Sequence, residues 1–238
     1  FTPEDGSGFV TTGAVVLAAQ ASSGLAVTFV TNGGPALITG GTNLIFTGAG
    51  TVSISALQAG DANWNEAPGK TNTFNVAKAT APVFLSNLTQ VCDGTAKKVG
   101  ASTIPPGLAV VVTYDGNSWA PTNVGEYAVT GTVNDVLYQG SASGTLTIRV
   151  LPAPEVLPAS NGTVNAFWAN WQAVETATNY WVDVSEADDF SSYLAGYENR
   201  RAGPALTLSV TGLQARAEYY YRVRSENRTG VSTDSAPR

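Results

Sequence analysis

The chain has 238 residues, of which 43% are hydrophobic and 13% charged, so it can bury a core, unlike a disordered segment. Its net charge is −6, and the 12 Lys and Arg are spread thinly, which excludes a basic footprint for nucleic acid or an anionic membrane. No apolar run approaches the roughly 20 residues of a membrane-spanning helix. The absence of histidine and the single cysteine exclude Ser-His and Cys-His nucleophiles and the usual zinc sites.

Residues 1–77 contain short runs in which apolar and polar residues alternate, between Gly-rich and Asn-rich turns. This period of two predicts half-buried strands. The predicted inward positions are Leu25, Val27, Phe29, Val52, Ile54, Ala56, Phe74 and Val76. The text LAAQASSGLAVTFV, followed by GAGTVSISALQAGDANWNEAP, resembles a bacterial Ig-like repeat. The resemblance implies an immunoglobulin-like β-sandwich, although its first strand falls on the unusual segment FTPEDGSGFVTTG.

Residues 78–150 begin after the junction AKATAP and again predict strands. The inward positions in LAVVVTY, GEYAVTGTV and TLTIRV are Leu108, Val110, Val112, Tyr114, Tyr127, Val129, Val133, Leu146, Ile148 and Val150. The text VCDGTAKKV, with APTNVGEYAVTGTVNDVLYQGSASGTLTI, resembles the MBG-type module of bacterial surface proteins. Cys92 stands where that pattern carries Tyr, and we interpret it as a small buried hydrophobe, with a reactive thiol as the alternative.

Residues 151–238 open with the Pro-rich linker LPAPEVLP, and the rest of this segment resembles a fibronectin type III module. The resemblance rests on Trp171, on Tyr180, Val182 and Val184 in YWVDV, on Leu213 before YYYRVRS, and on the turn NRTGVS. Alternation places Phe167, Ala169, Trp171, Tyr221 and Val223 inward. Tyr219 is expected to form a tyrosine corner by bonding to upstream backbone. The ending SAPR stops before a full last strand, which indicates a cut boundary.

No constellation of nucleophile and base is present, so we expect no catalytic, cofactor-binding or metal-binding residues. The glycines of GSGFVTTG and GGTNLIFTGAG precede no helix and are predicted to form turns. Glu186, Asp188 and Asp189 lie together in a predicted loop. We interpret them as solvated, because the spacing of calcium ligands is missing; a weak calcium site is the alternative.

Outward-facing aromatic side chains are the candidates for a contact surface. Trp168, Trp181 and Tyr220 alternate with the inward series and can stack on sugars or anchor a protein partner. Trp64 and Trp119 are expected to cap their own sandwiches. Arg222 and Arg224 flank the outer face and are expected to form cross-strand surface pairs. The sequons at Asn87, Asn161 and Asn227 would accept glycans in a eukaryotic secreted protein, but the resemblances are to bacterial modules.

The sequence therefore predicts an all-β chain of three consecutive immunoglobulin-like β-sandwich domains in an elongated string. The predicted domains are a bacterial Ig-like domain at 1–77, an MBG-type domain at 78–150 and a fibronectin type III domain at 151–238. The predicted function is a non-catalytic structural or adhesive segment of a secreted or cell-surface bacterial protein, with protein partners or self-association. The alternatives are accessory modules of an extracellular hydrolase and a carbohydrate-binding region. Neither nucleic acid binding nor membrane insertion is expected.

Overall fold

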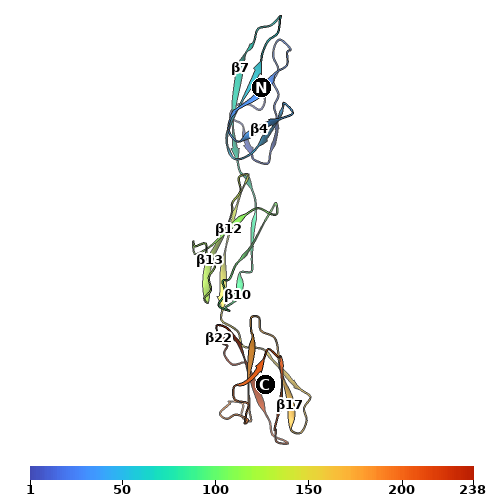
Figure 1. Ribbon diagram of the computed structural model, residues 1–238, viewed down its shortest axis with the longest axis vertical. Coiled ribbons are helices and arrows are strands. Elements are labelled where there is room, and N and C mark those ends of the chain that lie inside the picture. The colour runs from blue at the N-terminus through green and yellow to red at the C-terminus, as the bar shows by residue number, and fades with distance from the viewer. The chain divides into compact units, whose positions relative to one another are not determined.

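The computed structural model describes all 238 residues and consists of β-strands and loops, without an α-helix (Figure 1). The all-β prediction is therefore confirmed. No helix of the length and apolarity that a membrane span requires is present. The chain forms two compact units. The first comprises Phe1–Ser86, Gly100–Val112 and Thr130–Ser143, and the second comprises Asn87–Val99, Thr113–Val129 and Gly144–Arg238. The three predicted domain ranges remain a prediction.

Residues 1–77 fold into two sheets that face one apolar core. One sheet has the strand order β1 (Gly8–Val10), β7 (Ala67–Ala77), β6 (Gly50–Gln58) and β3 (Thr28–Gly33). The other has the order β2 (Ala14–Val16), β5 (Asn43–Phe46) and β4 (Ala36–Thr39). The first strand enters by parallel pairing with β7, with Phe9 opposite Val76. This pairing fixes which residues of the unusual N-terminal segment lie opposite which residues of β7.

The core of this segment confirms the predicted alternation along β6 and β7. Val52, Ile54 and Phe74 are fully buried, and Leu44 of the other sheet packs against them. Phe29 is half-buried against the same cluster. Gly34 follows β3 at a φ of +92°, where a Cβ atom would lie 2.1 Å from the Thr51 carbonyl oxygen. Only glycine therefore lets the chain pass so close to β6 on its way to β4.

Three strands of residues 78–150, namely β12 (Val110–Tyr114), β13 (Gly125–Val133) and β15 (Ser141–Arg149), have residues in both compact units. One sheet has the order β10 (Thr89–Val91), β15, β13 and β12. Two short ladders join β11 (Gly100–Thr103) to β9 (Val83–Ser86), and β14 (Tyr138–Gln139) to β8 (Ala79–Thr80). Leu146 and Ile148 are buried as predicted. Buried Tyr114 accepts a hydrogen bond from the Val99 backbone N–H at 2.8 Å.

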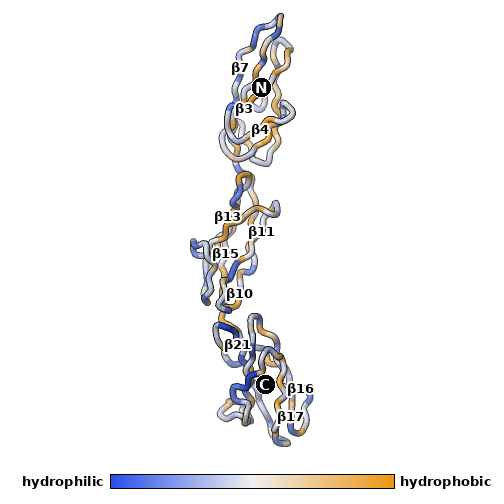
Figure 2. Tube along the Cα trace, viewed as in Figure 1, coloured by the Kyte–Doolittle hydropathy of each residue, from blue (hydrophilic) through white to orange (hydrophobic).

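Residues 151–238 form a sandwich of three and four strands. The smaller sheet has the order β16 (Val156–Ser160), β17 (Ala166–Trp171) and β20 (Thr207–Thr211). The larger has the order β19 (Arg200–Gly203), β18 (Asn179–Ser185), β21 (Tyr220–Asn227) and β22 (Gly230–Val231). The predicted inward residues Trp171, Tyr221 and Val223 are 2% exposed or less. Figure 2 shows that both hydrophobic and hydrophilic stretches occur in this part of the chain.

The predicted tyrosine corner is present in this sandwich. The Tyr219 hydroxyl accepts a hydrogen bond from the backbone N–H of Gln214 at 2.8 Å, so the contact with upstream backbone is confirmed. Tyr219 also packs against the core. Tyr221 makes a second such contact, because its hydroxyl donates to the Leu157 carbonyl and accepts from the Asn170 N–H. Burial raises the pKa of Tyr221.

Three positions differ from the sequence-based expectation, and all three lie outside regular strands. Trp64 and Trp119 are 53% and 70% exposed, so neither caps a sandwich. The Asp61 carboxylate accepts the backbone N–H groups of Asn63 and Trp64, and this turn leaves the indole in solvent. Val150 is 67% exposed because β15 ends one residue earlier, at Arg149. The inward alternation does not continue past a strand end.

The C-terminal residues hydrogen-bond to the last long strand of this sandwich. The segment after Val231 runs alongside β21 with hydrogen bonds from Ser232 to Ser225, from Ser235 to Val223 and in both directions between Arg238 and Tyr221. The Ser235 hydroxyl additionally accepts the Val223 N–H at 2.9 Å. Residues 232–238 therefore satisfy backbone groups of β21 as an irregular last strand, and no regular strand is formed after Val231.

Candidate functional site

The three predicted contact aromatics lie on different outer faces of the 151–238 sandwich. Trp168 lies on β17 and is 40% exposed. Trp181 on β18 and Tyr220 on β21 are half-buried and belong to the other sheet. Since the two sheets turn their inner faces toward one core, their outer faces point away from each other. The structure does not bring the three residues together into one platform.

The Trp181 side chain is already engaged by its own sandwich. Its indole N–H donates to Glu226 Oε2 at 2.9 Å, and the same oxygen accepts the Asn179 amide at 2.6 Å. The Arg201 guanidinium carbon lies 5.9 Å from the centroid of the indole ring. These contacts leave Trp181 with only part of its ring available to a partner.

Tyr220 stands beside an acidic residue. Its hydroxyl donates to Glu218 Oε2 at 3.4 Å, and the negative charge of Glu218 raises the pKa of Tyr220. Ser185 lies opposite Tyr220 on β18, whereas Trp181 lies opposite Arg224, four residue pairs further along the same two strands. Trp181 and Tyr220 therefore share one outer face but are separated by the pair formed by Asp183 and Arg222.

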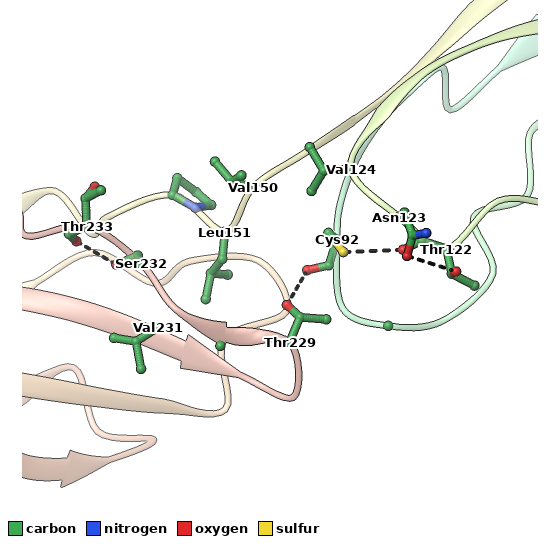
Figure 3. A pocket seen from close by; sticks show the side chains of 13 residues that line it. Cys92, Thr122, Asn123, Val124, Val150, Leu151, Thr229, Val231, Ser232 and Thr233 are labelled. Atoms are coloured by element: carbon green, nitrogen blue, oxygen red, sulfur yellow. Dashed lines mark hydrogen bonds between the residues drawn. The ribbon is translucent and has the colours of Figure 1, made fainter.

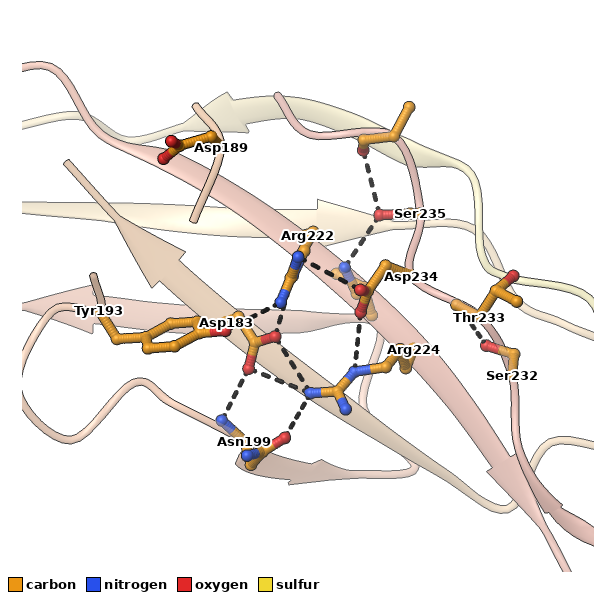
Figure 4. A network of polar contacts seen from close by, with 12 residues as sticks. Asp183, Asp189, Tyr193, Asn199, Arg222, Arg224, Ser232, Thr233, Asp234 and Ser235 are labelled. Carbon is orange, nitrogen blue, oxygen red and sulfur yellow. Dashed lines mark hydrogen bonds and ion pairs between the residues drawn. The ribbon is translucent and has the colours of Figure 1, made fainter. Parts of the chain in front are cut away.

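A closed ionic network occupies the space between them (Figure 4). The Asp183 side chain is 2% exposed and binds Arg222 Nε at 3.0 Å and an Arg224 terminal nitrogen at 3.1 Å. Asp234 of the C-terminal segment pairs with both arginines, at 3.2 and 3.1 Å. The predicted cross-strand pairing is confirmed, but the pairs are not surface pairs, because the arginine side chains are only 20% and 22% exposed.

The segment between β18 and β19 covers this network. The backbone N–H of Asn199 donates to Asp183 Oδ1 at 2.7 Å, and Arg222 donates to the Tyr193 hydroxyl at 3.0 Å. The Arg222 guanidinium carbon lies 4.3 Å from the ring centroid of buried Phe190. Burial alone would lower the pKa of Arg222, but the hydrogen bond with Asp183 and the charges of Asp234 and Asp183 raise it. Two positive and two negative charges balance, so the network holds segments together and offers no free charge to a ligand.

The acidic loop is solvated, as predicted. Glu186, Asp188 and Asp189 are exposed. Asp189 Oδ1 accepts the backbone N–H of Ser191 at 2.9 Å, and this hydrogen bond lowers the pKa of Asp189. The structure contains no group of three or more His, Cys, Asp or Glu residues that could hold a metal ion. The predicted weak calcium alternative thus finds no assembled ligand set.

A cavity of about 700 Å³ lies beside Cys92, in the second compact unit (Figure 3). The Cys92 side chain is 8% exposed, in agreement with a buried hydrophobe, and its thiol donates to the Thr122 carbonyl at 3.3 Å. Cys92 is the one ionisable side chain of the lining. The remaining lining side chains are apolar groups, hydroxyls and one amide: Thr122, Asn123, Val124, Val150, Leu151, Pro152, Thr229, Val231, Ser232 and Thr233. No base is placed to activate the thiol.

The turn that borders the cavity is tied to the Cys92 backbone. The Asn227 side-chain amide donates to the Cys92 carbonyl at 2.9 Å and to Thr176 Oγ1 at 3.1 Å. Arg228 donates to the neighbouring Asp93 carbonyl at 3.3 Å. Sequence reasoning missed this contact, because an Asn in a turn motif gives no indication of a partner 135 residues away.

Comparisons with known proteins agree with the prediction for the middle segment. Residues 81–150 match the family model of the MBG domain. No curated protein matches the chain. Among solved structures, domains A168–A170 of titin give a TM-score of 0.36 at 16% identity, covering 98% of this chain and 94% of that one.

Two further solved structures contain fibronectin type III domains. Chicken CNTN1 FN1–FN3 gives a TM-score of 0.32 at 9% identity over 99% of this chain and 98% of that chain. The sixth fibronectin type III domain of a human protein, fibronectin type III domain containing protein 3, gives 0.27 at 20% identity over 37% and 78%. The resemblance of the middle segment to the MBG-type module is confirmed by the family match over residues 81–150.

Proposed function

We propose that this chain is a non-catalytic spacer and protein-contact segment of a secreted or cell-surface bacterial protein. The observation that carries the proposal is the use of its buried polar groups. Asp183 and Asp234 together neutralise Arg222 and Arg224, and the Asn227 side-chain amide is hydrogen-bonded to a backbone carbonyl and a hydroxyl. Catalytic sites instead keep titratable groups poised in a cleft. Here the polar chemistry serves to hold strands, loops and turns in place.

The cavity beside Cys92 supports the same assignment. A catalytic or cofactor pocket needs convergent polar groups with acid, base or electrophilic character. The cavity beside Cys92 offers hydroxyls and aliphatic side chains, without a carboxylate or a cationic group. Its chemistry fits a structural hollow beside hydrogen-bonded loops.

The two alternatives receive less support. Carbohydrate binding by Trp168, Trp181 and Tyr220 would need a shared face, and Trp168 lies on the other sheet. A role as accessory modules of an extracellular hydrolase is compatible with the absence of a base in the cavity. Sequencing the flanking gene regions distinguishes that role from a purely structural one, because a hydrolase carries its own catalytic domain.

Small-angle scattering of the monomeric chain tests the spacer role. A compact 238-residue globule would have a radius of gyration of about 18 Å. We expect a clearly larger value, because a spacer must separate its two ends. A radius of gyration near that of a compact globule would overturn the proposal.

A further inference from the structure

The first segment has an unusual distribution of charge. Residues 6–60 contain no Asp, Glu, Lys or Arg, although the whole chain carries 30 such residues. Every charge in the first 60 residues is therefore confined to Glu4 and Asp5. The strands β2, β4 and β5 all lie inside this neutral stretch.

The two sheets of this segment expose opposite kinds of surface. On the outer face of β6 and β7, Thr51 pairs with Asn75 and Ser53 pairs with Thr73. Polar outer residues are the usual condition for an antiparallel sheet with one solvated face. The outer face of β2, β5 and β4 is instead formed by Ala14, Val16, Asn43, Ile45, Leu37 and Thr39.

The apolar members of this second face are adjacent and strongly exposed. Ala14 and Leu37 both lie directly opposite Ile45, so the three form one row across the sheet. Leu37 is 59% exposed and Ile45 is 50% exposed. Val16, at 64%, begins the neighbouring row. A cluster of exposed aliphatic side chains on three paired strands is typical of an interaction surface.

The absence of charge restricts what can cover this face. A charged partner surface would lose hydration and find no counter-charge among these six residues. A second copy of this chain offers the same neutral face, so neither copy buries an unpaired charge. The charged residues that give the chain its net charge of −6 all lie outside residues 6–60. Two copies that associate through this face therefore do not have to bring like charges of the face together.

We propose that the outer face of β2, β5 and β4 is the surface through which two copies of this chain associate. The contact is isologous, with the Ala14, Ile45 and Leu37 row of one copy on the same row of the other. A face of six small and medium residues buries little area, so the association is weak and reversible. The inference names the partner within the proposed contact role and rests on that role.

Sedimentation velocity of the 238-residue chain from micromolar to millimolar concentration tests the proposal. We expect a concentration-dependent monomer–dimer equilibrium. Leu37→Lys and Ile45→Lys should each weaken it at least about tenfold, because in a symmetric contact each substitution brings two like charges together. Leu37→Ser removes apolar surface without adding charge and should weaken it less. Circular dichroism verifies that the variants fold.

Val30→Lys is the matched control. Val30 is 40% exposed in the same segment, but it lies on β3 of the other sheet, opposite Ser55. Its substitution should leave the dimerisation constant unchanged. A wild-type chain that stays monomeric at millimolar concentration, or a dimer that survives both lysine substitutions, would overturn the inference. Scattering from monomeric Leu37→Lys separates the two proposals, because a large radius of gyration there keeps the spacer role intact.

Discussion

Residues 1–77 and 151–238 reach the same two-sheet architecture by different means. The first segment has a core of apolar side chains and contains no ion pair. The last segment adds to its apolar core the buried Asp183, bound by two arginines, on the outer face of its larger sheet. An apolar core without ion pairs therefore suffices for this architecture, and the ionic network of the last segment serves to attach a covering loop and an irregular last strand.

The largest effect should come from removing the central aromatic of the last segment. Trp171→Ala should destabilise that segment by about 3–5 kcal/mol, because Trp171 is 2% exposed and its removal leaves a cavity. Denaturant unfolding followed by circular dichroism measures the loss. Trp181→Ala is the control on the same sandwich, and about 1 kcal/mol is expected for its half-buried ring and its bond to Glu226. A larger loss of stability for Trp181→Ala than for Trp171→Ala would mean that the strand register described for this sandwich is wrong by one residue.

Breaking the ionic network should cost less than emptying the core but more than a surface change. Asp183→Asn leaves Arg222 and Arg224 partly buried with only Asp234 as a counter-charge, so a loss of about 3 kcal/mol is expected. The exposed Asp188 supplies the control, since Asp188→Asn should be within about 0.5 kcal/mol of wild type. Urea midpoints compare the two. Equal midpoints would show that the network contributes nothing beyond the apolar core.

Acid should weaken the part of the chain that is stabilised by the Asp93 carboxylate. Hydrogen bonds from Lys97 and Thr95 lower the pKa of Asp93 far below its ordinary value. A carboxyl group with a depressed pKa in the folded state stabilises at neutral pH, and this contribution declines as the pH falls below about 4. Stability measured from neutral to acidic pH should therefore fall less steeply in Asp93→Asn. The exposed Glu126→Gln should keep the wild-type profile, and identical profiles for all three proteins would contradict the assignment.

The smallest effect is expected at an exposed tryptophan of the first segment. Trp64→Ala should change the unfolding free energy by no more than about 0.5 kcal/mol, because the indole is 53% exposed and its turn is held by Asp61. Thermal unfolding of the variant provides the measurement. A loss of more than about 2 kcal/mol would restore the capping role that the exposure argues against.

The sequence predicted the strand interiors well, because a period of two reports directly which face is buried. Val52 with Ile54, and Tyr221 with Val223, are buried as their alternation indicates. The predictions failed in turns and at strand ends, where apolar and polar residues do not alternate with a period of two. Trp64, Trp119 and Val150 lie in turns or just past a strand, and there a large apolar side chain does not reveal its direction.

The network around Asp183 could not be predicted from alternation either. Asp183 occupies an outward position between Val182 and Val184, and such a carboxylate is expected to be exposed. Its burial arises from residues far along the chain, including Asn199 and the Asp234 segment. The available signal was a carboxylate on one strand facing two arginines spaced by two on its neighbour, which predicts a pair but not its cover.

The side chain of Asn227 has a consequence for the chemical modification of the chain. N-linked glycans attach to the amide nitrogen of Asn. In Asn227 this nitrogen donates hydrogen bonds to the Cys92 carbonyl oxygen and to Thr176 Oγ1, and the residue is only 6% exposed. The other two sequon residues, Asn87 and Asn161, are exposed. The hydrogen bonds of the Asn227 amide therefore shield this nitrogen from modification once the chain has folded. A host that adds glycans after folding would leave Asn227 bare, and one that adds them during synthesis would prevent the turn from closing on Cys92.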